Sequence, residues 1–322
     1  MPDPIKKCAD HLPAWVFEKM IKRKVCPLCG AEASGGTIKR NDQLSIIQCA
    51  HCPMAYVDSI PDIPTLNAYY DTGYFLGKKS FFTGSDYCYA RHQAVLSGRP
   101  VTGYREIISD FNPKGKDILE IGCSSGALLQ QLKAHMPNSL LGLDFAQWPI
   151  DYGKRMYGLD LRCSSLENER FSAESFDLVI MVDVLEHVPE PLSLTQKINR
   201  MLRPRGMLFV ITPNFGAFLK AKINWIQLST SYEHLQYFSR ESLALLGERT
   251  SFHIKRVYTQ GLPISLRQYP EGSNHRFEKY FLYPHIAAIN LYRKLYYGKV
   301  ANQGGGNDLI AFLEKKQGTM NA

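Results

Sequence analysis

The chain contains two Cys-x-x-Cys pairs with nineteen residues between them, Cys26 with Cys29 and Cys49 with Cys52. Each pair directs two thiolates toward one point, and four thiolates close a tetrahedral Zn²⁺ shell with no open position. We therefore predict a structural zinc ion in a ribbon whose hairpin strands are residues 37–39 and 44–48. His51 lies between two of these cysteines and is expected to be a bystander. Four unrelated core cysteines are the alternative interpretation.

A glycine turn follows the short apolar run at residues 117–121. Gly122 and Gly126 let backbone amides approach a ligand closely, and a helical apolar pattern begins directly after them. A strand, a glycine turn and a helix in this order form a nucleotide-type pocket. A dinucleotide fingerprint would need glycine at positions 124 and 127, where the chain has Ser124 and Ala127, so a nicotinamide cofactor is excluded.

Two aspartates follow further apolar runs. Asp144 ends a second predicted strand at residues 139–144, 24 residues beyond Glu120. In doubly wound sheets an acidic residue there accepts hydrogen bonds from both ribose hydroxyls. Capping of the helix that begins near Ala146 is the alternative. Asp183 follows an apolar run typical of a central parallel strand, at the point where that strand opens toward the ligand crevice.

The rest of the sheet is predicted from shorter patterns. We expect a third strand at residues 159–163, a helix at 190–202, a turn at 203–206 and a fifth strand at 207–212. Residues 253–258 and 308–314 are predicted as strands six and seven, with strand seven as the antiparallel edge strand.

The Glu120-x-Gly122-x-x-x-Gly126 turn and the segment Phe176-Asp-Leu-Val-Ile-Met-Val-Asp-Val-Leu-Glu-His-Val-Pro189 resemble two motifs of class I S-adenosylmethionine (SAM) methyltransferases. This resemblance implies an α/β fold with a Rossmann-like seven-stranded sheet. It also implies SAM as cofactor, contacted by Glu120, Gly122, Cys123, Ser124, Gly126, Asp144, Phe145, Ser165, Leu166 and Asp183. At position 165 the family usually has an acidic residue for the adenine amino group, and Glu167 is a substitute for it here.

The element Tyr232-Glu-His-Leu-Gln-Tyr-Phe-Ser239, together with the zinc ribbon, is similar to the zinc-containing methyltransferases of bacterial sugar and antibiotic pathways. The resemblance assigns substrate binding and proton removal to Tyr232, Glu233 and His234, and His234 becomes the candidate general base. His187 is a second candidate base, with a structural cap as its alternative. Ser239 is predicted to cap a helix at residues 241–247.

The expected organisation is a zinc-ribbon module at residues 1–60, an aromatic linker or lid at 61–105 and a SAM-binding domain at 106–322 with an insertion at 262–307. The insertion carries an aromatic and basic helix. That helix could pack on the core or on a second copy in a homodimer, close over the substrate, or touch a membrane surface.

The composition is that of a globular protein, and the chain shows neither a bilayer-spanning apolar run nor a secretory leader, so we expect a cytoplasmic location. The leading functional hypothesis is methyl transfer to a hydroxyl of a small-molecule acceptor, a saccharide or a natural-product scaffold. The net charge of +8 leaves an RNA base methyltransferase as one alternative, although a nucleic-acid partner is not the expectation. A catalytically inactive SAM-fold binding protein is the other.

Overall fold

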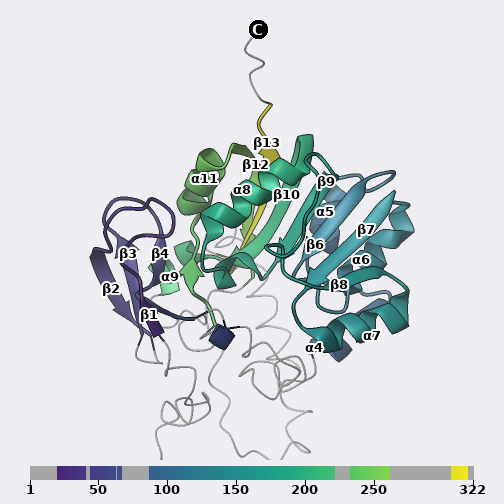
Figure 1. Cartoon of the computed structure of the whole chain (residues 1–322), viewed down its shortest axis with the longest axis horizontal. Helices are drawn as coiled ribbons and strands as arrows, with labels where there is room; N and C mark the ends of the chain where they lie inside the picture. Colours follow the sequence, from purple (N-terminus) through teal and green to yellow (C-terminus); the bar gives the residue numbers. More distant parts are fainter. Residues whose placement is uncertain are drawn as a thin grey trace, which may run out of the picture.

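A computed structural model describes the chain over residues 20–40, 44–62, 64–66, 87–221, 233–261 and 306–317. Figure 1 shows a large central sheet with helices on both sides and a smaller sheet beside it. Residues 63 and 67–86 of the predicted aromatic linker, most of the insertion and Tyr232 lie outside the described residues. Among the described residues, no helix is long and apolar enough to cross a bilayer.

The central sheet has seven strands in the order β12-β13-β10-β9-β6-β7-β8. In chain order they are β6 (Asp117–Ile121), β7 (Ser139–Asp144), β8 (Asp160–Cys163), β9 (Phe176–Val182), β10 (Leu202–Pro213), β12 (Phe252–Gln260) and β13 (Asp308–Lys315). The pairs from β10 through β9, β6 and β7 to β8 are parallel. This arrangement confirms the predicted seven-stranded Rossmann-like sheet.

The position predicted for the last strand was wrong. β13 is antiparallel to its neighbours, as expected, but it lies between β10 and β12, so β12 is at the edge. Residues 309–313 form an uninterrupted run, Leu-Ile-Ala-Phe-Leu, and all five are fully buried. A strand that is apolar on both faces belongs in the interior of a sheet, whereas residues 254–260 of β12 keep part of their surface accessible.

Helices cover both faces of the central sheet. One face carries α4 (Tyr87–Leu96), α5 (Tyr104–Asp110), α6 (Ala127–Leu132) and α7 (Gln147–Tyr157), and the other carries α8 (Pro191–Met201) and α11 (Arg240–Arg249). Successive strand residues alternate between the two cores: Ile118 packs with the first group and Leu119 with the second. The capping of α11 by Ser239 is confirmed, since Ser239 and Ser242 form a reciprocal capping box.

The chain between α8 and the regular part of β10 differs from the predicted turn. β10 already begins at Leu202, directly after the helix, and its register with β9 shifts between Leu202 and Met207. Arg205 in this stretch has a positive φ of 63°. The predicted turn residues are therefore an irregular first part of the strand rather than a separate connection.

The small sheet has the order β11-β4-β3-β2. The predicted hairpin is confirmed as β2 (Gly35–Lys39) and β3 (Ser45–Cys49), and β4 (Ala55–Val57) follows. The remaining strand is β11 (Gln236–Tyr237), which comes from far along the chain. A separate pair joins β1 (Met20–Lys22) to β5 (Ser59–Pro61).

The small sheet shares its core with the central sheet. Cys26, Leu28 and Met54 pack in the same buried cluster as Leu243 and Leu246 of α11. The Arg249 guanidinium of the same helix donates hydrogen bonds to the carbonyls of Leu28 and Cys29. The cysteine-bearing segment therefore packs as part of the same folded body.

Candidate active site

The glycine turn after β6 has the backbone geometry that the sequence predicts. Gly122 has φ +71°, and a Cβ there would lie 2.4 Å from Val184 Cγ2. Gly126 has φ +73° and precedes α6 as its N-cap. Ser124 stands where the methyltransferase motif usually has glycine, and it also adopts a positive φ, 51°. The substitution therefore keeps the left-handed backbone that glycine would favour.

Asp144 closes this turn from the end of β7. Its Oδ2 accepts a hydrogen bond from the Ser124 amide at 2.9 Å, and its Oδ1 accepts one from the Ala146 amide at 3.0 Å. The structure thus shows a structural role for Asp144, close to the alternative interpretation of its sequence position. A carboxylate offers about four acceptor positions, so ribose hydroxyls can still bind the same side chain. Burial raises the pKa of Asp144 to about 6.

Glu120 lies under the glycine turn and is 1% exposed. Burial raises its pKa to about 8, although the positive charge of Arg91 opposes the shift. Among the described residues, Glu120 Oε2 and Ser125 Oγ are buried without a hydrogen-bond partner. Buried polar atoms normally have a hydrogen-bond partner, and these two lie beside a turn where only small residues fit. They therefore mark a site that a polar ligand can complete.

The other predicted cofactor contacts surround the same strand ends. Phe145 is exposed directly after Asp144, and Ser165 is half-buried beyond β8. Cys123 and Leu166 are buried with their side chains in the two cores, so a ligand can reach Leu166 only through its backbone. The carboxyl ends of the neighbouring parallel strands β6, β7 and β8 carry Gly122, Asp144 and Ser165, and a nucleoside can lie across them. These residues fit SAM.

Asp183 follows β9 at the same edge. It has a positive φ of 54°, and its amide donates to the Ile211 carbonyl at 3.0 Å. Part of its surface remains exposed. Its pKa is nevertheless raised to about 6, first by desolvation among the surrounding protein and second by the negative charge of Asp308.

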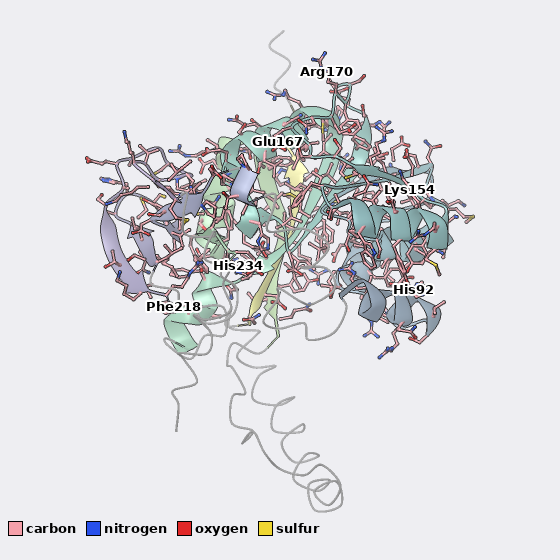
Figure 2. All side chains as sticks on the ribbon, turned by 60° about the horizontal axis from the view of Figure 1, so that its bottom comes forward. His92, Lys154, Glu167, Arg170, Phe218 and His234 are labelled. Atoms are coloured by element: carbon pink, nitrogen blue, oxygen red, sulfur yellow. The ribbon has the colours of Figure 1, made fainter. Side chains whose placement is uncertain are left out.

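The turn after Asp183 brings a carboxylate and two imidazoles together. Glu186 and His187 belong to the 3-10 helix η3 (Leu185–His187), and His234 precedes β11. The rings of His187 and His234 are 4.8 Å apart between centroids, in an edge-to-face arrangement. Glu186 Oε1 lies 3.8 Å from His187 Nε2 and 3.9 Å from His234 Nε2. Two of the predicted catalytic residues are therefore neighbours, and Figure 2 shows His234 at the junction of the two sheets.

These groups are held by hydrogen bonds on their outer sides. The Thr212 hydroxyl donates to Glu186 Oε2 at 2.8 Å, and His187 Nδ1 lies 3.2 Å from the Glu233 carbonyl. Burial lowers the pKa of His187 to about 4 and lowers that of His234 well below its usual value, so both rings are neutral at pH 7. Burial also raises the pKa of Glu233 to about 7.

His234 is buried, with 6% of its surface exposed. The buried Arg40, from the end of β2, donates a hydrogen bond to the His234 carbonyl at 2.7 Å and another to the Tyr237 hydroxyl at 3.0 Å. The Leu235 amide donates to the Glu186 carbonyl at 2.9 Å. The small sheet and the turn after β9 therefore hold His234 from two sides.

Glu186 and Arg40 are site residues that the sequence did not identify. The available signal for Glu186 was its place beside His187 at the end of a central strand. Arg40 carried no signal, because its contact with His234 spans 194 residues of sequence.

The four cysteines form a separate cluster in the small module. Cys26 Sγ lies 3.6 Å from Cys52 Sγ, and Cys29 Sγ lies 3.7 Å from Cys49 Sγ. All four sulfur atoms lie within 4.8 Å of one another. Zinc bonds of ~2.3 Å place tetrahedral sulfur ligands roughly 3.8 Å apart, so this cluster has the size of a tetrathiolate metal site.

Comparison with known proteins extends these observations. A family model described as a methyltransferase domain matches residues 92–256, just over half of the chain. The ubiquinone biosynthesis O-methyltransferase of Coxiella burnetii (strain Dugway 5J108-111) is 31% identical over 113 residues, which cover 33% of this chain and 48% of that protein. The enzyme of the same name from Haemophilus ducreyi is 33% identical over 110 residues, covering 31% and 46%. The matched stretch thus spans about half the length of these relatives.

Solved structures are also similar to this chain. A SAM-dependent methyltransferase from Mesorhizobium loti aligns over 70% of this chain and 98% of that one, with 15% identity and a TM-score of 0.45. The family match covers the glycine turn, Asp144, Asp183 and His234, whose geometry is described above. The chain therefore belongs to the methyltransferase-domain family.

Proposed function

We propose that this enzyme methylates a hydroxyl of a small-molecule acceptor. The observation that carries the proposal is the position of the Glu186, His187 and His234 side chains, at the carboxyl end of a strand that pairs directly with β6. The glycine turn follows β6, so a proton-accepting group and the cofactor turn occupy neighbouring strand ends. Transfer to oxygen needs both, because a hydroxyl must lose its proton while it attacks the methyl carbon.

SAM would be held by the turn at residues 122–126, by Asp144 and by the chain after β8. When bound, SAM supplies an electrophilic methyl group on a positively charged sulfur. Positioning supplies most of the rate enhancement, since orientation of two reactants can remove ~7–11 kcal/mol from a barrier. The buried turn provides this rigidity: Gly122 packs against Val184, and Asp144 ties the turn to β7.

His234 is the candidate base in this proposal. Its ring is neutral at pH 7, and its Nδ1 has no hydrogen-bond partner among the described residues, so that nitrogen can accept a proton. Glu233, the residue before His234, is a candidate to assist it, and Tyr232 stays a predicted substrate contact outside the described residues. A positioned base typically contributes about 10²–10⁴-fold to the rate. His187 is the second candidate, since it lies beside His234.

A small acceptor is favoured by the relatives, whose name is that of an O-methyltransferase in ubiquinone biosynthesis. A sugar or antibiotic scaffold, the acceptor class that the sequence element at 232–239 indicated, stays a prediction. The homodimer and the cytoplasmic location also stay predictions.

We also propose that the four cysteines bind Zn²⁺ as a structural ion, because four thiolates leave no position open for a substrate.

Transfer of labelled methyl from SAM to a panel of hydroxyl-bearing sugars, phenols and natural-product scaffolds tests this function. Incorporation that requires an acceptor hydroxyl and falls about 10²-fold or more in His234→Ala would support it. Incorporation into RNA, with steep dependence on salt, would instead favour an RNA base methyltransferase. Bound SAM with no transfer to any class would favour a binding protein.

A further inference from the structure

A lysine of α8 reaches the loop that follows β8, residues 164–169, which we call the β8 loop. The ammonium group of Lys197 donates hydrogen bonds to two carbonyl oxygens of this loop, that of Leu166 and, at 3.1 Å, that of Glu169. The lysine is half-buried. A lysine ammonium has three donors and no acceptor, so two of its three donors hold this one loop.

The β8 loop is also fixed by its own backbone. Its start is held at the end of β7, where the Ser164 amide donates to the Asp144 carbonyl at 2.9 Å. Its end closes on itself, because the Glu169 amide donates to the Leu166 carbonyl at 3.3 Å. That carbonyl is one of the two that Lys197 binds, so the lysine holds the closed end of the turn.

The same helix holds the side chain of Leu166. Leu166 is 2% exposed and packs in one buried cluster with Leu194 and Ile198, which lie three residues before and one residue after Lys197. Helix α8 therefore fixes both the carbonyl and the side chain of Leu166. Its amide, in contrast, forms no hydrogen bond among the described residues, although the residue is buried. Buried amides normally have a partner, so this donor points to a ligand.

The position of this amide selects the part of the cofactor that it can contact. The inference rests on the proposed SAM site, in which the glycine turn follows β6 and Asp144 ends β7. With the ribose at Asp144, the base lies over the end of the next parallel strand, which is β8. Adenine has a ring nitrogen, N1, that accepts a hydrogen bond beside an amino group that donates. A buried donor at Leu166 matches this nitrogen.

We propose that Lys197 is a positioning residue for the adenine ring of SAM. Through the Leu166 carbonyl it holds the β8 loop in the arrangement that directs the Leu166 amide at adenine N1. Ser165 precedes this amide, and its hydroxyl can both donate and accept, so it can bind either an amino group or a keto group. Selection of adenine therefore depends on the amide and, through the loop, on Lys197.

Two ligands that differ only in the base test this assignment. S-adenosylhomocysteine has an N1 that accepts, whereas S-inosylhomocysteine carries a hydrogen on N1 and would place one donor against another at Leu166. Calorimetry with the full-length wild type should show at least roughly 10-fold tighter binding of S-adenosylhomocysteine, because an unmatched buried donor is costly. Lys197→Met has a side chain of similar length without a donor, and its preference should fall below about threefold.

Three further variants serve as controls. Lys197→Arg retains donors and should keep the preference for adenine. Lys197→Gln is too short to reach both carbonyls and should lose it, and this variant decides the result if Lys197→Met does not fold. Lys154→Met is the matched control, because Lys154 is an exposed lysine of α7 near Cys163 at the end of β8 (Figure 2). It should keep the preference.

An unchanged ratio of the two affinities in folded Lys197→Met would overturn the proposal, even if both affinities fell, because a general loss of stability weakens both ligands alike. Equal affinities of the wild type for the two ligands, or no binding of either, would also overturn it. The assay uses no acceptor. A preference for adenine that Lys197→Met abolishes, in a chain that methylates no acceptor, would therefore reject the proposed function alone.

Discussion

The guanidinium of Arg40 donates a hydrogen bond to the carbonyl of His234 at 2.7 Å, across 194 residues of sequence. Arg40 lies at the end of β2 in the cysteine-bearing module, and His234 lies beside Glu186 in the candidate active site. Shortly after His234, the chain pairs with β4 of the same module through Gln236 and Tyr237. The small module therefore helps to hold the candidate catalytic histidine in place.

Replacement of Arg40 by methionine should destabilise the contact between the small module and residues 234–237. The change leaves the His234 carbonyl and the Tyr237 hydroxyl without their donor, at a cost of about 1–3 kcal/mol for each buried group. We expect the free energy of unfolding to fall by roughly 2–4 kcal/mol in denaturant titrations. Amide exchange over residues 234–238 should accelerate. Arg155→Met, at an exposed position, is the control; an equal loss of stability there would show that the buried contact is not the cause.

Loss of Zn²⁺ from the four cysteines, where we propose that it binds, should loosen the same segment but leave the glycine turn at residues 122–126 intact. The cysteine module contacts α11 and β11, whereas the glycine turn is tied to β7 through Asp144. In protein stripped by a chelator, or in Cys49→Ser, we expect a lower melting temperature and faster amide exchange at residues 234–238. S-adenosylhomocysteine affinity should change little. Loss of cofactor binding in a chain that remains folded would contradict this separation.

Replacement of Gly122 by alanine should weaken cofactor binding. The new Cβ would lie 2.4 Å from Val184 Cγ2, and the positive φ adds about 1–2 kcal/mol of strain. Gly158→Ala is the matched control, because Gly158 has φ +61° but nothing within 4 Å of an added Cβ. Calorimetry with S-adenosylhomocysteine should show lost affinity only for Gly122→Ala. Equal losses in both variants would mean that the packing against Val184 is unimportant.

The stability of the ligand-free protein should depend on pH through Glu120. Burial raises the pKa of Glu120 from 4.5 in the unfolded chain to about 8 in the folded one. Between these values the folded state binds more protons, so the Glu120 contribution to stability is lost as pH rises, by up to about 1.4 kcal/mol per pH unit. Glu120→Gln should remove this dependence and gain stability relative to the wild type from pH 5 to pH 8. A constant difference across that range would contradict the raised pKa.

Short sequence patterns predicted the parts of the fold that interactions between neighbouring residues determine. The turn at 122–126, the cysteine hairpin and the Ser239 cap each depend on a few adjacent residues, and the structure shows all three. The position of residues 308–315 could not be obtained in that way. The apolar pattern of this strand does not show whether another strand pairs with its second edge. In the structure, β12 pairs with that edge.

The composition of the candidate active site was only partly predictable for a related reason. His187 and His234 were each identified from their own segments. Their contact with Glu186 depends on how residues 233–237 pass between the small sheet and the turn after β9. The sequence did not single out Glu186, because the second imidazole beside it, His234, comes from a distant segment of the chain.

The binding of S-adenosylhomocysteine to zinc-loaded protein, measured by calorimetry with Asp144→Asn beside the wild type, tests the central claim most directly. Cofactor recognition at the end of β7 predicts saturable binding to the wild type and a roughly 10–100-fold weaker affinity in the variant, which loses one acceptor oxygen beside the turn. The absence of any binding to folded wild-type protein, or equal affinities for the two proteins, would contradict the assignment of the SAM site to the glycine turn and Asp144.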